Sequence, residues 1–251
     1  MKLIIIGVGG KMGKTLVNCI NSNGKDEILC GIDAYCEKDA FPFSVYQSTA
    51  LIPTDLKPDV IIDFSVREAI YDFLPYAIKT KTPCVIATTG HTQEQSNYIF
   101  ECADKIPVFK TGNMSVGINL LLRLAKIGAA TLGESADIEI VETHHNQKVD
   151  APSGTALLLA NGIKEALPTD PDFVYGRSGH VGKRGKEIGI HAVRGGTVVG
   201  KHEISFFLNN EIITLKHEAE SKSVFAYGAL DAAAYLISKP AGLYDMQDLL
   251  S

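Results

Sequence analysis

The side chains best suited to acid–base chemistry are concentrated in residues 142 to 156, which read ETHHNQKVDAPSGTA. Imidazole is a side chain suited to general acid catalysis, which makes His144 and His145 candidates, although a lone histidine is more often structural. Adjacent histidines on a strand point to opposite faces, so only one would line a cleft unless the strand has already ended. Lys148 could bind an acidic group through a charge-assisted hydrogen bond or deliver a proton itself. This stretch predicts proton transfer to an anionic substrate.

A helix start follows directly in the sequence. Pro152 and Ser153 precede an apolar run, so the first free amides of this short helix belong to residues around Gly154 and Thr155. A helix N-terminus stabilises an anion by about 0.3 to 2 kcal/mol, and the Thr155 hydroxyl can add a hydrogen bond. These amides predict a carboxylate site. No cysteine or further histidine lies nearby at ligand spacing, so we expect no metal.

A glycine-rich loop near the start of the chain predicts dinucleotide binding. The loop follows the apolar run from Leu3 to Ile6 and precedes a helical stretch to about Asn21. Glycines at these positions permit a tight turn, approach of the backbone to a pyrophosphate, and close packing of helix against strand. The helix N-terminus then offers N–H donors to phosphate. The loop residues are Gly7, Val8, Gly9, Gly10, Lys11, Met12 and Gly13.

Asp33 closes the second expected strand, where an acidic side chain can bind the adenosine ribose hydroxyls. Its charge would oppose a 2′-phosphate by roughly 3 kcal/mol at about 5 Å and an effective dielectric constant near 20. NADH is therefore the expected cofactor. Lys11 could partly offset the repulsion, so NADPH use stays open. The alternative is that Asp33 is a solvated turn residue.

The order of expected elements indicates an α/β chain with two architectures. Buried strands at 3–6, 28–33, 60–64, 84–88 and 108–110 alternate with helices, which predicts a doubly wound parallel sheet of the Rossmann type. After a long helix from about 115 to 132, a strand at 137–143 and three runs at 187–193, 198–208 and 211–217 predict an α+β domain with an open mixed or antiparallel sheet. The expected domains are 1–114, 115–220 and a helical segment, 221–251, that packs back on the first.

Composition excludes several classes of partner. The formal net charge of −5 and the pI near 5.8 give no general attraction for nucleic acid or anionic membranes. Five cysteines without C-x-x-C spacing and a short apolar start predict a cytoplasmic protein with reduced thiols. One dense basic cluster could steer or enclose an anion, or could be a solvated mobile loop; it comprises Arg177, Lys183, Arg184, Lys186 and Arg194.

The sequence resembles the dihydrodipicolinate reductase family nearly end to end. The resemblance is carried by GVGGKMG at 7–13, ATTG at 87–90, GNMSVG at 112–117, the block at 142–156, and EIGIHAVRGG at 187–196. It implies NAD(P)H-dependent reduction of a small cyclic dicarboxylate, 4-hydroxy-tetrahydrodipicolinate, in lysine and diaminopimelate biosynthesis. It also implies a homotetramer built through the sheet of the second domain.

The resemblance also implies roles for individual residues. His144 would be the proton donor, Lys148 would have acid and substrate-binding roles, His145 would contact substrate, and Gly154 and Thr155 would hold a carboxylate. The dinucleotide would be held by the glycine loop and Asp33, together with Ala87, Thr88, Thr89, Thr111, Gly112, Asn113 and Met114.

One position departs from the family pattern. Where the family often has an arginine that binds a substrate carboxylate, this chain has Lys222, which keeps the charge but loses the two-bond fork. A solvated lysine at a helix start is the alternative. Two other functions stay open: a dehydrogenase acting on aspartate or its semialdehyde, and a nucleotide-sensing module without turnover. The second would not need His144 and Lys148 beside a substrate pocket.

Overall fold

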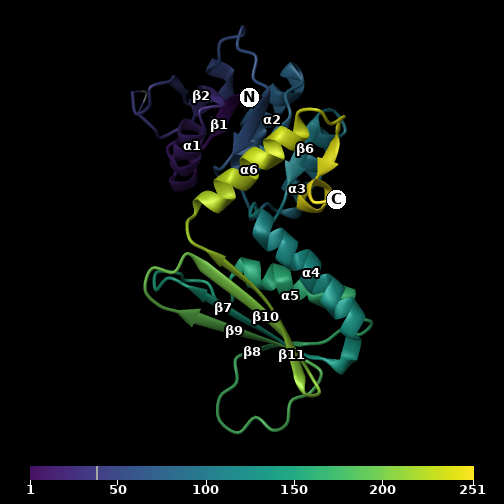
Figure 1. Cartoon of the computed structure of the whole chain (residues 1–251). Helices are drawn as coiled ribbons and strands as arrows, with labels where there is room; N and C mark the ends of the chain where they lie inside the picture. Colours follow the sequence, from purple (N-terminus) through teal and green to yellow (C-terminus); the bar gives the residue numbers. More distant parts are fainter. Residues whose placement is uncertain (38) are drawn as a thin grey trace. The chain divides into compact units, whose positions relative to one another are not determined.

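The chain is divided into two units in the computed structural model, which describes residues 1–37 and 39–251 (Figure 1). The first unit comprises Met1–Ser115 and Lys222–Ser251, and the second comprises Val116–Ser221. The first unit is therefore assembled from two separate segments of sequence, with the second unit inserted between them.

A seven-stranded parallel sheet forms the centre of the first unit, in the order β12-β6-β5-β4-β1-β2-β3. Strand β1 lies between β2 and β4, so the chain turns in both directions from it. This arrangement confirms the predicted doubly wound sheet. The strands are β1 (Lys2–Ile6), β2 (Glu27–Ile32), β3 (Val45–Tyr46), β4 (Val60–Asp63), β5 (Cys84–Ile86), β6 (Pro107–Lys110) and β12 (Gly242–Tyr244).

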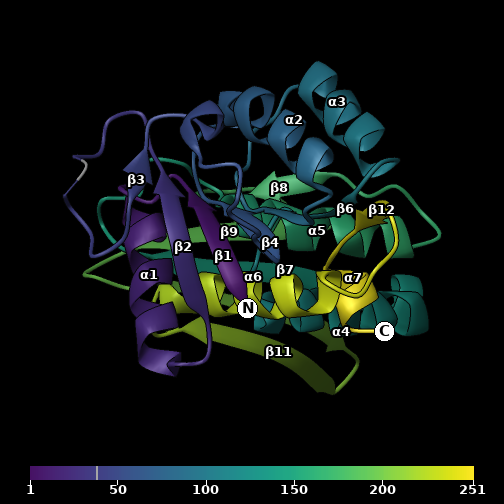
Figure 2. The same cartoon turned by 90° about the horizontal axis from the view of Figure 1, so that it is seen from above.

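Helices cover both faces of this sheet, which explains why its strands are nearly continuous apolar runs. Figure 2 shows α2 (Ile70–Thr80) and α3 (Gln93–Ala103) on one face, and α1 (Lys11–Asn23) and α6 (Ser223–Leu236) on the other. Buried side chains of β1 and β4 pack with Phe73 and Leu74 of α2. The shorter elements are the 3-10 helices η1 (Thr49–Leu51) and η2 (Arg67–Ala69), and α7 (Met246–Leu249).

The second unit contains a five-stranded mixed sheet, in the order β11-β10-β7-β9-β8. Strands β11, β10 and β7 are antiparallel neighbours, whereas β7, β9 and β8 run parallel. The predicted open mixed sheet is thus confirmed. The elements are β7 (Asp137–His144), β8 (Phe173–Tyr175), β9 (Ile188–Arg194), β10 (Gly200–Leu208), β11 (Glu211–Ala219), α4 (Val116–Leu132), α5 (Gly154–Ala166) and the 3-10 helix η3 (Gly133–Ser135).

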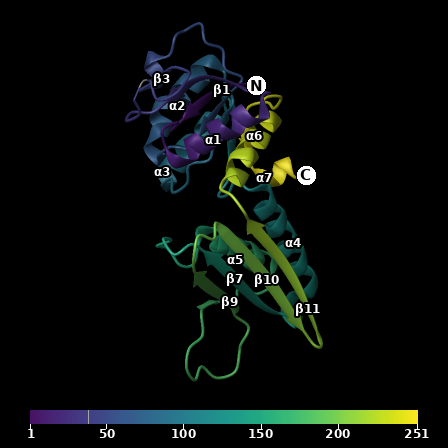
Figure 3. The same ribbon diagram turned by 60° about the vertical axis from the view of Figure 1, so that its left-hand side comes forward.

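Helices α4 and α5 pack together on one face of this sheet (Figure 3). The core between helices and sheet includes Ala125, Leu159, Ile140 and Phe206. By length and composition the segment Val116–Ser135 could cross a membrane. Because one face of α4 is buried in the core, packing within the second unit accounts for much of its apolar character.

The structure adds elements that the sequence patterns did not reveal. Strands β3, β8 and β12 are two or three residues long, too short to show alternation, and α7 has four residues. The helix expected to be short after Ser153 covers the thirteen residues of α5, because its apolar face continues to Ile163.

Candidate functional site

The glycine loop lies between β1 and α1, as predicted, and two of its glycines are required by geometry. Gly7 has a φ of +77°, and a Cβ there would lie 2.5 Å from the carbonyl oxygen of Phe64. A Cβ on Gly13 would lie 2.2 Å from the carbonyl oxygen of Gly7, so only glycine lets α1 approach β1 this closely. Gly10 caps α1 without a side-chain hydrogen bond. No side chain at the N-cap position competes for the first amides of α1, as the predicted pyrophosphate site requires.

Asp33 directly follows β2 and ties its turn to the glycine loop. Its Oδ2 accepts a hydrogen bond from the Gly9 amide at 2.9 Å, and its Oδ1 accepts from the Tyr35 and Cys36 amides at 3.0 and 3.1 Å. A hollow of about 520 Å³ beside this carboxylate is lined by Gly9, Gly10, Lys14, Asp33, Tyr35, Cys36, Glu37 and Ala40. Its lining includes Lys14, which lies one turn beyond Lys11 in α1. Lys11 is the residue that we expected to offset the charge of Asp33.

A second hollow, of about 460 Å³, lies beside the other end of the glycine loop. It is lined by Met12, Phe64, Ser65, Val66, Arg67, Glu68, Ala87, Thr88 and Thr89. The predicted residues Met12 and Ala87–Thr89 therefore meet here. Residues 64–68 were missed as site residues, although their position after a strand adjacent to β1 was a usable signal, because ligands bind at the carboxyl ends of such strands.

Buried Asp63 organises this second hollow. Its Oδ1 accepts hydrogen bonds from the Ser65 amide at 3.0 Å and from the Ser65 hydroxyl, while the Ser65 amide also reaches Thr88 Oγ1 at 2.9 Å. Burial raises the pKa of Asp63 to about 6, against the hydrogen bonds from Ser65 and Thr88. Ser65, which Asp63 holds, thereby links the ends of β4 and β5 through its amide contact with Thr88.

The remaining predicted dinucleotide residues follow β6. Thr111, Gly112 and Asn113 line neither hollow, and Met114 is buried. Asn113 Oδ1 accepts a hydrogen bond from the Ser115 amide at 2.8 Å, which shapes the turn. The predicted residues thus follow β1, β2, β5 and β6 at one edge of the sheet, and the first three groups contribute to the lining of these two hollows.

In the second unit, the predicted proton donor His144 ends strand β7. Alternation along this strand places Ile138, Ile140, Glu142 and His144 on its buried face. His144 Nδ1 lies 2.6 Å from Glu142 Oε2, and Glu142 is fully buried. Because β7 ends at His144, strand alternation does not fix the direction of the His145 side chain. Its Nδ1 is buried and has no hydrogen-bond partner among the described residues.

Glu142 binds two further groups. Arg194 of β9 donates to both carboxylate oxygens at 2.8 Å, and the Ser153 amide donates to Oε1 at 2.9 Å. Burial alone would raise the pKa of Glu142, but hydrogen bonds from Arg194, His144 and Ser153 outweigh it and lower the pKa. Glu142 is therefore an ionised carboxylate at the centre of the cluster. We call Glu142, His144, Arg194 and Ser153 the Glu142 cluster.

The loop after β7 brings the other predicted substrate residues beside this cluster. Lys148 Nζ forms an ion pair with Asp150 at 2.8 Å, and the Lys148 side chain is one-fifth exposed. Ser153 caps α5 by accepting a hydrogen bond from the Ala156 amide at 3.1 Å. Helix α5 begins at Gly154, so Gly154 and Thr155 form its first turn, as predicted.

His202 was missed by sequence reasoning. It lies directly opposite Glu142 on the neighbouring strand β10, and its ring packs edge-on against His144 at 5.2 Å between centroids. Its Nε2 lies 3.2 Å from Ser153 Oγ. Burial lowers the pKa of His202 to about 4, so the ring is neutral. Only the register of β7 and β10 could have revealed this neighbour.

The basic cluster does not form a free cationic surface. Arg177 donates to Glu139 at 3.0 Å and Glu187 at 2.9 Å, and Arg184 donates to Asp137 at 3.0 Å and Glu139 at 3.2 Å. Lys186 donates to the carbonyl oxygen of Glu134, whereas Lys183 is exposed. The charges of Arg177 and Arg184 are therefore paired within the second unit, which speaks against both alternatives for these two arginines, a charge that steers an anion and a mobile solvated loop.

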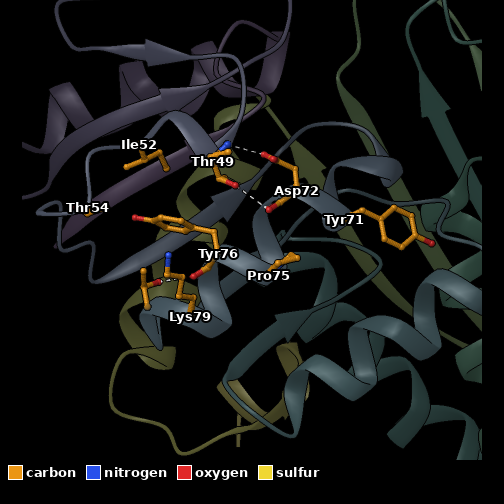
Figure 4. Close-up of a pocket in the computed structure, with 10 residues that line it drawn as sticks. Thr49, Ile52, Thr54, Tyr71, Asp72, Pro75, Tyr76 and Lys79 are labelled. Carbon is orange, nitrogen blue, oxygen red and sulfur yellow. Dashed lines mark hydrogen bonds between the residues drawn. The ribbon is translucent and has the colours of Figure 1, made fainter.

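Lys222 and a third hollow both belong to the first unit. Lys222 is the exposed N-cap residue of α6 in the first unit and makes no side-chain cap. A hollow of about 390 Å³ lies between η1 and α2, where Asp72 accepts from the Thr49 amide at 2.9 Å (Figure 4). No predicted site residue lines this hollow.

Within residues 1–37 and 39–251 no three His, Cys, Asp or Glu side chains are grouped to hold a metal.

Comparison with known proteins identifies close relatives along the whole chain. Residues 1–114 match the family model "Dihydrodipicolinate reductase, N-terminus", and residues 117–250 match "Dihydrodipicolinate reductase, C-terminus". The 4-hydroxy-tetrahydrodipicolinate reductase of Caldanaerobacter subterraneus subsp. tengcongensis is 47% identical over 100% of this chain and 98% of its own length. That of Clostridium tetani is 41% identical over 100% of this chain and 97% of its own length.

Solved structures share the fold over nearly the whole chain. Dipicolinate-bound dihydrodipicolinate reductase from Paenisporosarcina sp. TG-14 aligns with a TM-score of 0.81 and 26% identity, covering 98% of this chain and 97% of that one. Aspartate dehydrogenase from Thermotoga maritima aligns with a TM-score of 0.53 and 14% identity, covering 96% and 98%. The second likeness concerns the fold alone.

Proposed function

Since this chain belongs to the dihydrodipicolinate reductase family, we propose that it reduces its substrate with NADH at least as efficiently as with NADPH. The reaction of the family, NAD(P)H-dependent reduction of 4-hydroxy-tetrahydrodipicolinate to tetrahydrodipicolinate in lysine biosynthesis, is the activity of this chain. The bound dinucleotide supplies the hydride. The chain's own residues must hold both molecules and deliver the proton that completes the reduction.

The preference for NADH rests on Asp33. The fit is supported by the close packing of Gly7 and Gly13 and by the two hollows beside the loop, whose linings include Gly9, Gly10 and Met12. The pyrophosphate would bind at Gly7 to Met12, and the adenosine ribose at Asp33. A carboxylate at Asp33 opposes a 2′-phosphate, while Lys14 on the same hollow reduces that repulsion. Ala87–Thr89 and Thr111–Met114 would hold the nicotinamide half.

The observation that carries the substrate site is the position of His144 beside the N-terminus of α5. The amides of Gly154 and Thr155 bind one substrate carboxylate, where the helix N-terminus favours an anion. Lys148 exchanges its exposed ion pair with Asp150 for a substrate carboxylate, and His145 contacts the ring. His144 then donates a proton from Nε2, since its Nδ1 is bound to Glu142.

We assign the dinucleotide to residues 1–114 with 221–251, and the substrate to 115–220.

The face of the second sheet opposite α4 and α5 carries the exposed apolar side chains Val141 (36%), Val193 (47%) and Phe207 (39%). The exposure of these apolar side chains supports a homotetramer formed through the sheet, in which a second copy would cover them. The five free cysteines support a cytoplasmic location.

The decisive experiment measures oxidation of NADH and NADPH with freshly generated 4-hydroxy-tetrahydrodipicolinate. We expect turnover with both cofactors and a kcat/KM for NADH at least equal to that for NADPH. A kcat/KM for NADPH ten times that for NADH would overturn the role of Asp33. Absence of turnover with either cofactor would refute the proposed function. Light scattering of the same sample tests the tetramer.

A further inference from the structure

The buried carboxylate of Glu142 has a role that its contacts define. We propose that Glu142, fixed by Arg194, is a positioning residue that sets both the orientation of the proton donor His144 and the start of α5. This inference rests on the proposed function of His144 and of the α5 amides. Glu142 itself is fully buried behind His144 and does not need to touch substrate.

The carboxylate has a complete set of donors. Oε1 accepts from Ser153 N at 2.9 Å and Arg194 Nη2 at 2.8 Å, and Oε2 accepts from Arg194 Nη1 at 2.8 Å and His144 Nδ1 at 2.6 Å. An ionised carboxylate is only an acceptor, so Nδ1 of His144 must carry its proton toward Glu142. The tautomer and the ring orientation are thereby fixed, as when a third group orients a catalytic histidine.

The opposite nitrogen of His144 is left for substrate. A Cβ built on Gly200 would lie 3.1 Å from His144 Nε2, tighter than ordinary packing, so glycine at this position keeps the nitrogen uncrowded. The Glu142 contact and Gly200 therefore act on the two ends of one ring. The first holds Nδ1, and the second leaves space at Nε2, where the proton is given up.

The same anchor reaches the carboxylate site. Arg194 Nη2 also donates to the carbonyl oxygen of Asp150 at 2.6 Å, so the guanidinium binds the loop between β7 and α5. Glu142 holds the amide of Ser153, whose hydroxyl caps α5. Displacement of Glu142 would thus disturb His144 and the amides of Gly154 and Thr155 together.

The chain supplies a matched control on the same strand. Glu139 also binds a histidine and arginines, His191 at 2.7 Å and Arg177 at 3.0 Å, but it lies on the opposite face of β7. Glu142→Gln and Glu139→Gln remove one carboxylate charge each with little change of shape. Only the first removes the group that holds His144.

The experiment compares kcat, KM and the pH profile of kcat for the two variants. For Glu142→Gln we expect kcat to fall roughly 10- to 100-fold and substrate KM to rise several-fold. The pH above which kcat declines should move down by about one unit, because a negative charge beside the acid is lost. Glu139→Gln should stay within about twofold of the wild type, and NADH affinity should be unchanged in both.

The pH profile of kcat also depends on the other charged and titratable groups around His144. They come from β7, β9, β10, β11 and the loop, and comprise Glu142, Arg194, His202, His217, Lys148 and Asp150. A double-mutant cycle isolates the contribution through His144. In a His144→Asn background, Glu142→Gln should lower kcat no further, whereas its effect on KM should persist. Additive losses in kcat would overturn the proposed route through His144.

Two outcomes separate this inference from the proposed function. Full activity of His144→Asn would refute the role of His144 and hence the proposed function of the site. An impaired His144→Asn variant combined with a Glu142→Gln variant that behaves like Glu139→Gln would refute the positioning role alone. If circular dichroism shows that Glu142→Gln is unfolded, Arg194→Lys asks the same question, since lysine keeps the charge but cannot make the fork. Wild-type kcat and pH profile in Arg194→Lys would then refute the proposal.

Discussion

Two glutamate clusters on opposite faces of β7 are built from the same residue types. Glu142 binds His144 and Arg194, and Glu139 binds His191, with Arg177 and Arg184. Hydrogen bonds lower the pKa of both carboxyl groups against the opposing effect of burial. Glu142 is fully buried, whereas the Glu139 side chain is 17% exposed.

The difference lies in what surrounds each cluster. The Glu142 cluster stands at the end of β7, beside the N-terminus of α5 and the Lys148 loop. The arginines of the Glu139 cluster come from the 176–187 loop, and their ion pairs hold that loop on the sheet. In the described part of the chain, the hydrogen-bond partners given for the Glu139 side chain are Arg177, Arg184 and His191, none of which begins a helix. A Glu–His–Arg set therefore becomes a candidate site through its position, not through its composition.

The largest expected effect separates the histidines of the two clusters. His144→Ala should lower kcat roughly 100- to 1,000-fold, since positioned general acids contribute on the order of 10² to 10⁴. His191→Ala should stay within about twofold, because its partner Glu139 adjoins no substrate residue. Steady-state kinetics and NADH binding measure both. Equal losses in the two variants would remove the distinction between the clusters.

Lys148 sharpens the same contrast. Lys148→Ala should reduce kcat/KM roughly 10- to 100-fold through loss of a charge-assisted bond to substrate, with NADH affinity nearly intact. The control is Lys183→Ala, an exposed lysine in the 176–187 loop, which should match the wild type. Unchanged turnover in Lys148→Ala would leave this lysine as a structural partner of Asp150.

Burial of His202 beside Glu142 predicts a pH dependence of stability. The unfolded chain binds a proton near pH 6.5, whereas folded His202, with a pKa of about 4, does not. The free energy of unfolding should therefore fall as the pH drops from 6.5 to 4, by up to roughly 3 kcal/mol from this group. Asp63, with its raised pKa of about 6, acts in the opposite direction over this range.

The contribution of His202 is isolated by subtraction. Urea unfolding gives the free energy of unfolding of the wild type and of His202→Gln at pH 7 and at pH 4.5. The difference between the two proteins is then taken at each pH, and the effect of Asp63 cancels in that difference. We expect the wild type to lose about 2 to 3 kcal/mol more than the variant on acidification. A difference that does not change with pH would show that His202 is not held neutral.

The smallest expected effect asks whether the Glu142 cluster and Lys148 suffice for substrate binding. If Lys222 adds a carboxylate contact, Lys222→Ala should raise substrate KM several-fold, and Lys222→Arg should preserve or lower it, because arginine restores the planar fork. Substrate titrations at saturating NADH measure both. A wild-type KM in the alanine variant would show that Lys148 and the α5 amides bind the dicarboxylate without it.

Sequence reasoning recovered the features that depend on neighbours in the chain. The glycine loop, the position of Asp33 after a strand, and the block containing His144, Lys148 and the α5 start are all local patterns. Glu142 and Arg194 are 52 residues apart, and Ser153 and His202 are 49 apart. Their contacts follow from strand register in the second sheet, which no periodicity in a single sequence reveals. For the same reason the arginines at 177 and 184 resembled a free cationic loop.

The first sheet depends on a strand that is synthesised late. Strand β12 pairs with β6, but it lies after the whole second unit in the sequence, as does α6, which packs on α1. On the ribosome, the outer edge of β6 therefore stays unpaired while the second unit is translated. An unpaired edge is where nascent chains associate wrongly. Stalled or truncated products ending before Gly242 should consequently be clients for chaperones and proteases.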